Sequence, residues 1–182
     1  MRVRGVRFQS VFNRYSKDIK RILGNVMAAT KQKNKQIKSK ARVREHAEVF
    51  TAEKEVKAMC DLIPSEVWEN IESTFLEPAC GTGNFIVEIL ERKYQRCQNE
   101  KDGLKALVSV VGVDIQEDNC HECRTRLLKQ FIKRFPNASE LTILLASGIL
   151  ANNIICGDFL NPNEKLKSIG IEPCKKISKR RE

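Results

Sequence analysis

The chain has 182 residues, with 33 Lys or Arg, 23 Asp or Glu and a formal net charge of +10. This length suits one globular domain with a tail, and a hydrophobic share of 41% is that of a globular protein. No apolar run approaches the roughly 20 residues that cross a bilayer. No apolar stretch of the kind found in secretory signals follows Arg2, Arg4 and Arg7. We therefore expect a cytoplasmic protein with no membrane segment.

The positive charge is concentrated at the N-terminal side. Residues 1–40 hold 12 basic residues and one acid, Asp18, whereas residues 41–182 are close to neutral. Three interpretations stay open: a solvated tail, a sequence-independent contact with the DNA backbone, and an organelle transit peptide. We predict a basic arm and linker over residues 1–44, a globular domain over 45–160 and a basic tail over 161–182.

Seven cysteines are scattered along the chain without regular spacing, which favours reduced thiols. The run Cys120-His121-Glu122-Cys123 contains residue types that bind metals. The only other histidine is His46, and no second pair has the spacing that a four-ligand zinc site requires. We therefore predict no metal site, and we place Cys120 on the buried side of a helix.

The first half of the domain is predicted to contain two short helices, a strand and a longer helix. Val56, Met59 and Leu62 recur at helical spacing, which predicts a helix over residues 53–62 with Thr51 as its N-cap. There follow a helix over residues 65–71, a short strand at residues 74–77, a glycine turn, and a helix from Ile86 to about Gln98.

The second half continues the alternation of helices and strands. In chain order we predict a loop over residues 99–105, a buried strand over 106–113, helices over 117–135 and 139–151, and a strand over 153–156. This order is typical of an α/β fold with a parallel sheet and right-handed crossovers.

Three features fall beyond the carboxyl ends of the predicted strands, where ligands bind in such sheets: Gly81-Thr82-Gly83, Asp114 and Asp158. Asp114 is placed to accept hydrogen bonds from ribose hydroxyls, and Asp158 from the exocyclic amine of an adenine. Glu77 beside the glycine turn disfavours a pyrophosphate and suits a positively charged ligand. S-adenosylmethionine, a sulfonium nucleoside, fits this polarity better than a dinucleotide. The alternative is a glycine turn that only closes a strand–helix junction.

Four segments resemble the motifs of DNA adenine methyltransferases of restriction-modification systems, which methylate an exocyclic amine. The segment Leu76 to Phe85 is similar to the cofactor-binding motif, and His46 to Thr51 to the segment that precedes it. Gly112 to Asn119 and Ile155 to Phe159 are similar to the second and third motifs. They occur in the family's order and cover residues 46–159, with Ala52 where proline is usual.

The resemblance implies a Rossmann-like sheet of the class I S-adenosylmethionine-dependent methyltransferases, and methyl transfer to adenine N6 in DNA. It also implies a role for each residue that matches a motif. Phe50 and Thr51 would contact the methionine moiety; Glu77, Ala79, Gly81 and Gly83 would shape the pocket; Asp114 would hold the ribose; Ile115 would pack on the adenine; and Asp158 with Phe159 would contact the adenine edge.

The family's catalytic motif, Asn/Asp/Ser-Pro-Pro followed by an aromatic residue, is absent from this sequence. Asn161-Pro162-Asn163 lacks the second proline and the aromatic residue, and residues 164–182 contain no recognisable fourth strand. We therefore predict a sheet truncated after its third strand, no catalytic residue, and an isolated chain without activity.

Two other functions remain open. The chain is either a non-catalytic module that binds cofactor or DNA, or a split subunit whose partner chain carries the catalytic motif. A small-molecule or RNA methyltransferase is a further alternative. The expected partners are DNA, through the basic arm, and such a subunit.

Overall fold

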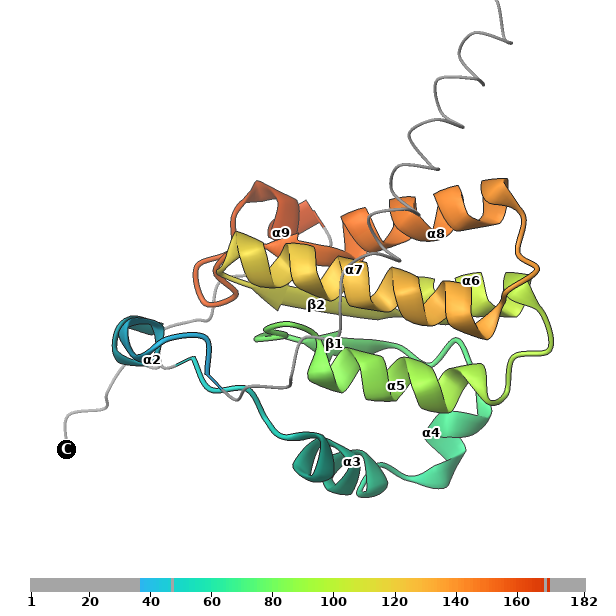
Figure 1. Ribbon diagram of the computed structural model, residues 1–182, viewed down its shortest axis with the longest axis horizontal. Coiled ribbons are helices and arrows are strands. Elements are labelled where there is room, and N and C mark those ends of the chain that lie inside the picture. The colour runs from blue at the N-terminus through green and yellow to red at the C-terminus, as the bar shows by residue number, and fades with distance from the viewer. Residues whose placement is uncertain (1–36, 47, 169, 171–182) are drawn as a thin grey trace, which may run out of the picture.

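The computed structural model describes residues 37–46, 48–168 and 170, and it shows a small parallel sheet covered by helices (Figure 1). Strands β1 (Phe75–Glu77), β2 (Val110–Asp114) and β3 (Ile154–Cys156) lie in the order β1-β2-β3. Both neighbouring pairs are parallel. The predicted α/β class with a parallel sheet is confirmed, and the arrangement is consistent with a Rossmann-like fold.

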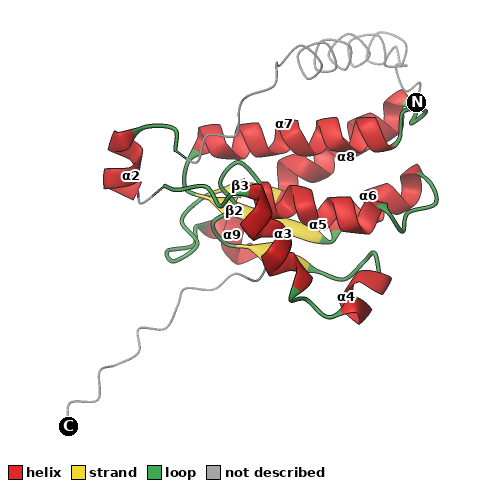
Figure 2. Cartoon of the chain, turned by 60° about the horizontal axis from the view of Figure 1, so that its bottom comes forward, coloured by secondary structure: helices red, strands yellow, loops and turns green. Residues whose placement is uncertain are grey.

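Helices connect the strands and cover one side of the sheet. Helices α6, α7 and α8 contact the strands directly, whereas α3 packs on α5 (Figure 2). None of the helices in the described part of the chain is long and apolar enough to cross a membrane. The helices are α2 (Lys40–His46), α3 (Glu53–Asp61), α4 (Ser65–Glu69), α5 (Asn84–Tyr94), α6 (Glu100–Val108), α7 (Glu117–Arg134), α8 (Glu140–Asn153) and α9 (Glu164–Ser168).

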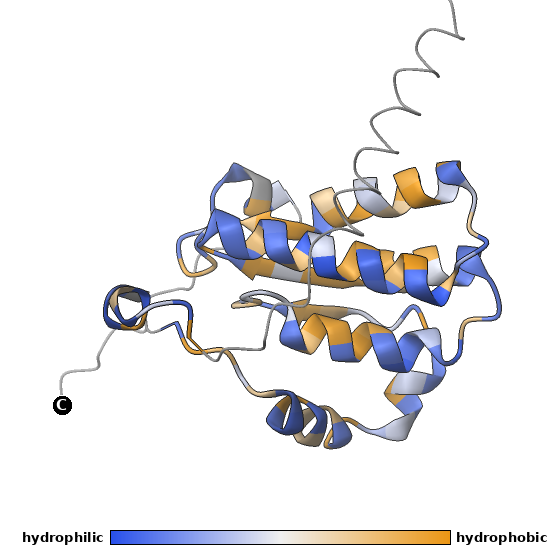
Figure 3. Cartoon of the chain, in the orientation of Figure 1, coloured by the Kyte–Doolittle hydropathy of each residue, from blue (hydrophilic) through white to orange (hydrophobic). Residues whose placement is uncertain are grey.

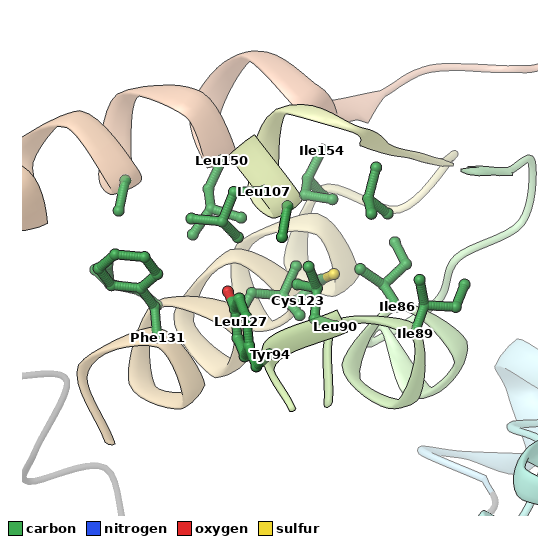
Figure 4. Close-up of a cluster of buried hydrophobic side chains, with 14 of the residues drawn as sticks. Ile86, Ile89, Leu90, Tyr94, Leu107, Cys123, Leu127, Phe131, Leu150 and Ile154 are labelled. Carbon is green, nitrogen blue, oxygen red and sulfur yellow. The ribbon is translucent and has the colours of Figure 1, made fainter. Parts of the chain in front are cut away.

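The main hydrophobic core lies between the sheet and these helices. Ile154 of β3 packs there with Leu90 of α5 and Leu127 and Phe131 of α7, all at most 1% exposed (Figure 4). Hydrophobic residues gather on the inner faces of α5 and α7, whereas α2 is mostly hydrophilic (Figure 3). Burial of these apolar side chains is the main force that holds the helices on the sheet.

The other face of the sheet carries a smaller cluster. Because side chains alternate along a strand, Val113 and Ile155 point away from the main core and pack against Leu166 of α9. Leu76 of β1 pairs with Val111 and is 49% exposed. This second face is therefore covered beside β3 and open beside β1.

The stretch before β2 differs from the prediction of a loop followed by a long strand. Residues 100–108 form helix α6, and the side chain of Asn99 caps it by accepting hydrogen bonds from the backbone of Lys101 and Asp102. Gly103 lies inside the helix, where a Cβ would be 2.3 Å from the ring of Phe135. Gly103 therefore allows close packing and does not break the helix.

The predicted face and cap of the first helix were also wrong. In α3 the buried residues are Val56 and Cys60, whereas Met59 and Leu62 are 53% and 83% exposed. Ala52 occupies the N-cap, and no side chain caps the helix. The helix is thus rotated so that i and i+4 residues, rather than i and i+3, face α5.

A linker was predicted through residue 44, but its last part is a helix. Helix α2 follows Lys38, and both Lys38 and Arg42 form ion pairs with α7. Apolar residues recur at helical spacing over residues 11–27, which predicts a partly helical arm, and these residues lie outside the described part of the chain. The division of the chain at residue 44 stays a prediction.

Candidate functional site

The glycine turn closes β1 onto α5 at the carboxyl edge of the sheet. Gly81 and Gly83 have φ of +52° and +89°, in the left-handed region that favours glycine. The backbone N–H of Cys80 donates to the carbonyl of Val113 at 2.8 Å, which fixes the turn to β2. A Cβ at Gly83 would lie 2.5 Å from Sγ of Cys123. Two glycines are therefore required by conformation and by space.

Asp114 ends β2 and holds the turn with its side chain. Its Oδ2 accepts a hydrogen bond from the N–H of Gly81 at 2.9 Å. Its Oδ1 accepts from the N–H of Gln116 at 2.8 Å and from Nδ2 of Asn119 at 3.1 Å. A carboxylate oxygen accepts two hydrogen bonds readily, so Oδ1 is saturated, and Oδ2 retains one lone pair to which no described residue donates. The predicted ribose-binding acid thus already organises the site.

The segment of residues 48–51, which we call the strap, lies over the turn. The ring of Phe50 is so close to Gly81 that a Cβ there would be 3.0 Å from Cε1. The carbonyl of Thr51 accepts a hydrogen bond from Nδ2 of Asn84, the first residue of α5, at 2.8 Å. The structure therefore brings Phe50 and Thr51 together with the turn.

Ion pairs fasten the strap and α2 to the first turn of α7. Arg42 donates to Asp118 at 2.6 Å and to Glu48 at 2.7 Å. Lys38 lies 3.0 Å from Asp118 and 3.1 Å from Glu122. The hydrogen bond from Arg42 holds the pKa of Asp118 well below its usual range, and Lys38 adds to this effect. Cations of the predicted arm are therefore used inside the chain.

Arg126 of α7 is a site residue that the motifs did not indicate. Its Nη1 donates to the carbonyl and the hydroxyl of Thr82, at 2.6 and 3.1 Å, and to Oδ1 of Asn84 at 2.8 Å. Thr82 is 6% exposed. The guanidinium thus hydrogen-bonds the acceptor atoms of Thr82 and Asn84 at the start of α5. In the sequence, an arginine on an amphipathic helix that binds the site looks the same as one that is exposed to solvent.

The other predicted residues surround the turn less closely. Ile115 is 56% exposed beside Asp114, as a surface on which a planar ligand packs would be. Phe159 packs against the small cluster under α9. Asp158 accepts hydrogen bonds from the N–H of Leu160 and from Nδ2 of Asn161, both at 2.8 Å. In the structure Asp158 therefore closes its own loop.

Glu77 and Ala79 occupy the start of the turn. Oε1 of Glu77 accepts a hydrogen bond from the N–H of Ala79 at 3.2 Å, while Ala79 itself is exposed. The Glu77 carboxylate is thus held at the turn, where it adds negative charge to that of Asp114.

A pair of thiols underlies the turn. Cys80 is 6% exposed and Cys123 is fully buried, and all the described cysteines are free. A hydrogen bond with Cys123, together with burial, raises the pKa of Cys80 far above its ordinary value. Burial raises the pKa of Cys120 to about 12. The prediction that Cys120 lies on the buried side of α7 is confirmed, and these thiols are unreactive while they remain buried.

The described part of the chain also has a surface hollow, away from the carboxyl edge of the sheet. The hollow, of about 290 Å³, is lined by Trp68, Glu88, Arg92, Gln95 and Arg96 and contains none of the predicted site residues. Among the described residues, no group of three or more His, Cys, Asp or Glu could hold a metal ion. The carboxyl edge of the sheet is therefore the site supported by both sequence and geometry.

Comparison with known proteins shows a partial similarity to a methyltransferase. No family model matches the sequence, and no solved structure matches it. The chain is similar to the type II methyltransferase M.VspI of Vibrio sp. (strain 343), with 34% identity over 80 residues. The alignment covers 43% of this chain and 16% of the length of M.VspI. It supports a methyltransferase relationship for this part of the chain, and S-adenosylmethionine as the cofactor only at the level of that family.

Proposed function

We propose that this domain binds S-adenosylmethionine and serves as the cofactor-binding part of a DNA adenine-N6 methyltransferase. The observation that carries the proposal is the position of Asp114, which ends β2, bonds to Gly81 and retains a free lone pair on Oδ2. This is where the ribose of a nucleoside cofactor binds in a doubly wound sheet.

The groups around Asp114 fit such a ligand. The Glu48 side chain is only 8% exposed, and its buried Oε2 accepts no hydrogen bond from any described residue. This buried acceptor suits a ligand that brings hydroxyl groups, and Nε of Arg42, in the side chain that pairs with Glu48, is a buried donor without a described partner. Glu77 and Asp114 add negative charge at the turn, which suits a sulfonium.

The cofactor, when bound, supplies a methyl group on a positively charged sulfur. The residues of this chain bind and orient it. Asp114 would accept a ribose hydroxyl, Phe50 and Thr51 would cover the methionine end, and Ile115 would pack on the adenine. Asp158 and Phe159 would contact the adenine edge, which in the case of Asp158 requires that its loop hydrogen bonds rearrange or share an oxygen.

Binding of S-adenosylhomocysteine, the demethylated product, tests the proposal directly. We expect measurable heat in isothermal titration at high protein concentration. The isosteric change Asp114→Asn should weaken binding by about 1.5–3 kcal/mol, roughly tenfold to 150-fold, because a charge-assisted hydrogen bond is lost. Glu69→Gln, on the exposed side of α4, removes the same charge away from the site and should bind like the wild type. Absence of heat, or equal affinity in both variants, would contradict the proposal.

We further propose that another chain supplies the groups that hold the target base. The run Asn161-Pro162-Asn163 has a structural role: Asn161 bonds to Asp158, and Oδ1 of Asn163 accepts from the N–H of Leu166 in α9. Pro162 is buried. The run therefore supports the loop after β3, and a partner subunit with an Asn-Pro-Pro-aromatic motif would complete the enzyme. DNA would bind through the basic arm.

A further inference from the structure

Asn119, in the first turn of α7, joins three separate parts of the chain. Its amide Nδ2 donates to Oε1 of Glu48 in the strap at 2.7 Å and to Oδ1 of Asp114 at 3.1 Å. Its Oδ1 accepts from Nζ of Lys38 at 2.8 Å. The residue is 1% exposed. Both amide hydrogens are therefore used, each on a different carboxylate.

This amide sets the orientation of Asp114. Together with the N–H of Gln116, it saturates Oδ1 and leaves Oδ2 to Gly81 and to a ligand. Rotation of the carboxylate would break these hydrogen bonds. Asn119 thus presents one oxygen of Asp114, in a fixed direction, at the carboxyl edge of the sheet.

The same amide also holds the strap. Glu48 stands two residues before Phe50, whose ring covers Gly81. The carboxylates of Glu48 and Asp114 repel each other, and the amide hydrogens of Asn119 lie between them. A donor at this position, together with Arg42, which also binds Oε1 of Glu48, holds the strap beside the Asp114 carboxylate.

We propose that Asn119 is a positioning residue that couples closure of the strap over the cofactor to the orientation of Asp114. This inference rests on the proposed function, since the cofactor is the ligand that both groups would contact. Asn119 would act on the ligand only through Glu48 and Asp114. This role also explains why an asparagine stands in a helical turn whose other polar residues, Glu117 and Asp118, are acidic.

The isosteric variant Asn119→Asp keeps the shape of the side chain and replaces the donor by a third carboxylate. At pH 8 we expect S-adenosylhomocysteine to bind about tenfold to a hundredfold more weakly than to the wild type, measured by isothermal titration. The carboxylates of Glu48 and Asp114 raise the pKa of the introduced carboxyl, whereas Nζ of Lys38 lowers it. At pH 5.5 we expect the oxygen that faces the two carboxylates to gain a proton and to donate one hydrogen bond. Most of the lost affinity should then return, relative to the wild type at the same pH.

Two variants make the result specific. Asn137→Asp adds the same charge on an exposed loop and should match the wild type at both pH values. Glu48→Ala removes both the strap's hydrogen bond to Asn119 and its ion pair with Arg42. It should weaken binding about tenfold without recovery at low pH, and it keeps the inference testable where Asn119→Asp fails to fold.

The outcomes separate the two proposals. Wild-type affinity in Asn119→Asp at pH 8, or a loss that is equal at both pH values, would overturn the positioning role and leave cofactor binding intact. Wild-type affinity in Glu48→Ala would likewise overturn it. Absence of binding by the wild type would contradict the proposed function. In that case amide hydrogen exchange of the ligand-free chain tests the coupling. Exchange at residues 48–51 should be faster in Asn119→Asp than in the wild type, and unchanged in Asn137→Asp. An unchanged rate in Asn119→Asp would overturn the inference.

Discussion

Gly83 and Cys123 pack so tightly that even a single methyl group on Gly83 would lie 2.5 Å from the sulfur. Gly83 is also the N-cap of α5 and has φ of +89°. The turn of the candidate site and the middle of α7 are therefore in direct contact.

Gly83→Ala should destabilise the fold by about 2–4 kcal/mol. The left-handed backbone alone costs a residue with a Cβ about 1–2 kcal/mol, and the contact with Cys123 adds the rest. Urea denaturation followed by circular dichroism measures the free energy of unfolding. Gly83→Ala combined with Cys123→Ala should recover only the part that is due to the contact.

Gly148 provides the matched control. It lies inside α8, and a Cβ there would meet nothing within 4 Å. Gly148→Ala should stabilise the chain by about 0.5–1 kcal/mol, because alanine loses less backbone entropy in a helix. Equal effects of the two alanine substitutions would contradict the packing described for Gly83.

Lys93 of α5 is buried beneath the start of β1 and predicts a pH dependence. Its ammonium donates to the carbonyls of Ile71 and Ser73 and to the hydroxyl of Ser109. The three acceptors match the three hydrogens of a charged lysine. Burial lowers the pKa of Lys93 to about 8.

The free energy of unfolding should rise relative to Lys93→Met as the pH increases from 8 towards 10.5. Below pH 8 both states hold the proton, and the buried charge lowers stability. Within this window the folded chain releases its proton first, so the unfolded state binds more protons and stability increases, by up to about 3 kcal/mol. Buried thiols that Lys93 does not influence, such as Cys120, have the opposite dependence in both proteins, and the difference removes their contribution. A difference that does not change with pH would contradict the lowered pKa.

Deletion of residues 1–36 should weaken binding to duplex DNA of random sequence and flatten its salt dependence. The deletion removes 10 of the 33 basic residues and retains Lys38 and Arg42, whose ion pairs hold α2. If about five of these cations meet phosphates, the slope of log affinity against log salt should change by about 4.5. Fluorescence anisotropy at several salt concentrations measures it. Replacing Lys31, Lys33 and Lys35 by Gln keeps the length of the chain and should change the slope by a smaller amount. A slope that the deletion leaves unchanged would show that the arm does not contact the DNA.

The purified 182-residue chain should transfer no methyl group to DNA. It contains no Asn-Pro-Pro-aromatic motif, so no group holds the adenine amine in line with the methyl group. Incubation with radiolabelled S-adenosylmethionine and unmodified DNA tests this expectation. Incorporation above the background without protein would show that another part of the chain performs the step.

The open side of β1 should make the chain self-associate. Within the described chain β1 pairs only with β2, and Leu76 is 49% exposed on the uncovered face. Exposed edges and apolar faces of this kind recruit another chain. Leu76→Lys should increase the monomer fraction in sizing chromatography with light scattering. Leu141→Lys, which changes an exposed leucine of α8, should not. A wild-type chain that stays monomeric at high concentration would refute the prediction.

The sequence predicted those elements whose pattern is set locally. Helices α7 and α8 and strand β3 were found within two residues of their ends, because their apolar periodicity and flanking polar residues agree. Helix α6 was missed because Gly103 is a typical loop residue, and its place in a helix is explained by close packing against the rings of Phe131 in α7 and of Phe135, the C-cap of α7. The rotation of α3 likewise depends on its packing against α5, which no local pattern encodes.

The candidate site divides in the same way. Gly81, Gly83 and Asp114 follow strands, and their chemistry is legible from position alone. Asn119 and Arg126 lie on a helix rich in charged residues, where one polar side chain looks like another. Their roles depend on which loops the fold brings within reach of α7, and this was not predictable from spacing.

The buried thiols beneath the glycine turn have a practical consequence. Cys80 and Cys123 react with an alkylating reagent only when the turn and α7 separate, since both side chains are buried and the hydrogen bond with Cys123 raises the pKa of Cys80. The rate at which these two cysteines are labelled, measured by mass spectrometry of the two peptides, therefore reports how often the site opens. A ligand bound at the turn should lower this labelling rate, so binding can be detected without a dye or tag.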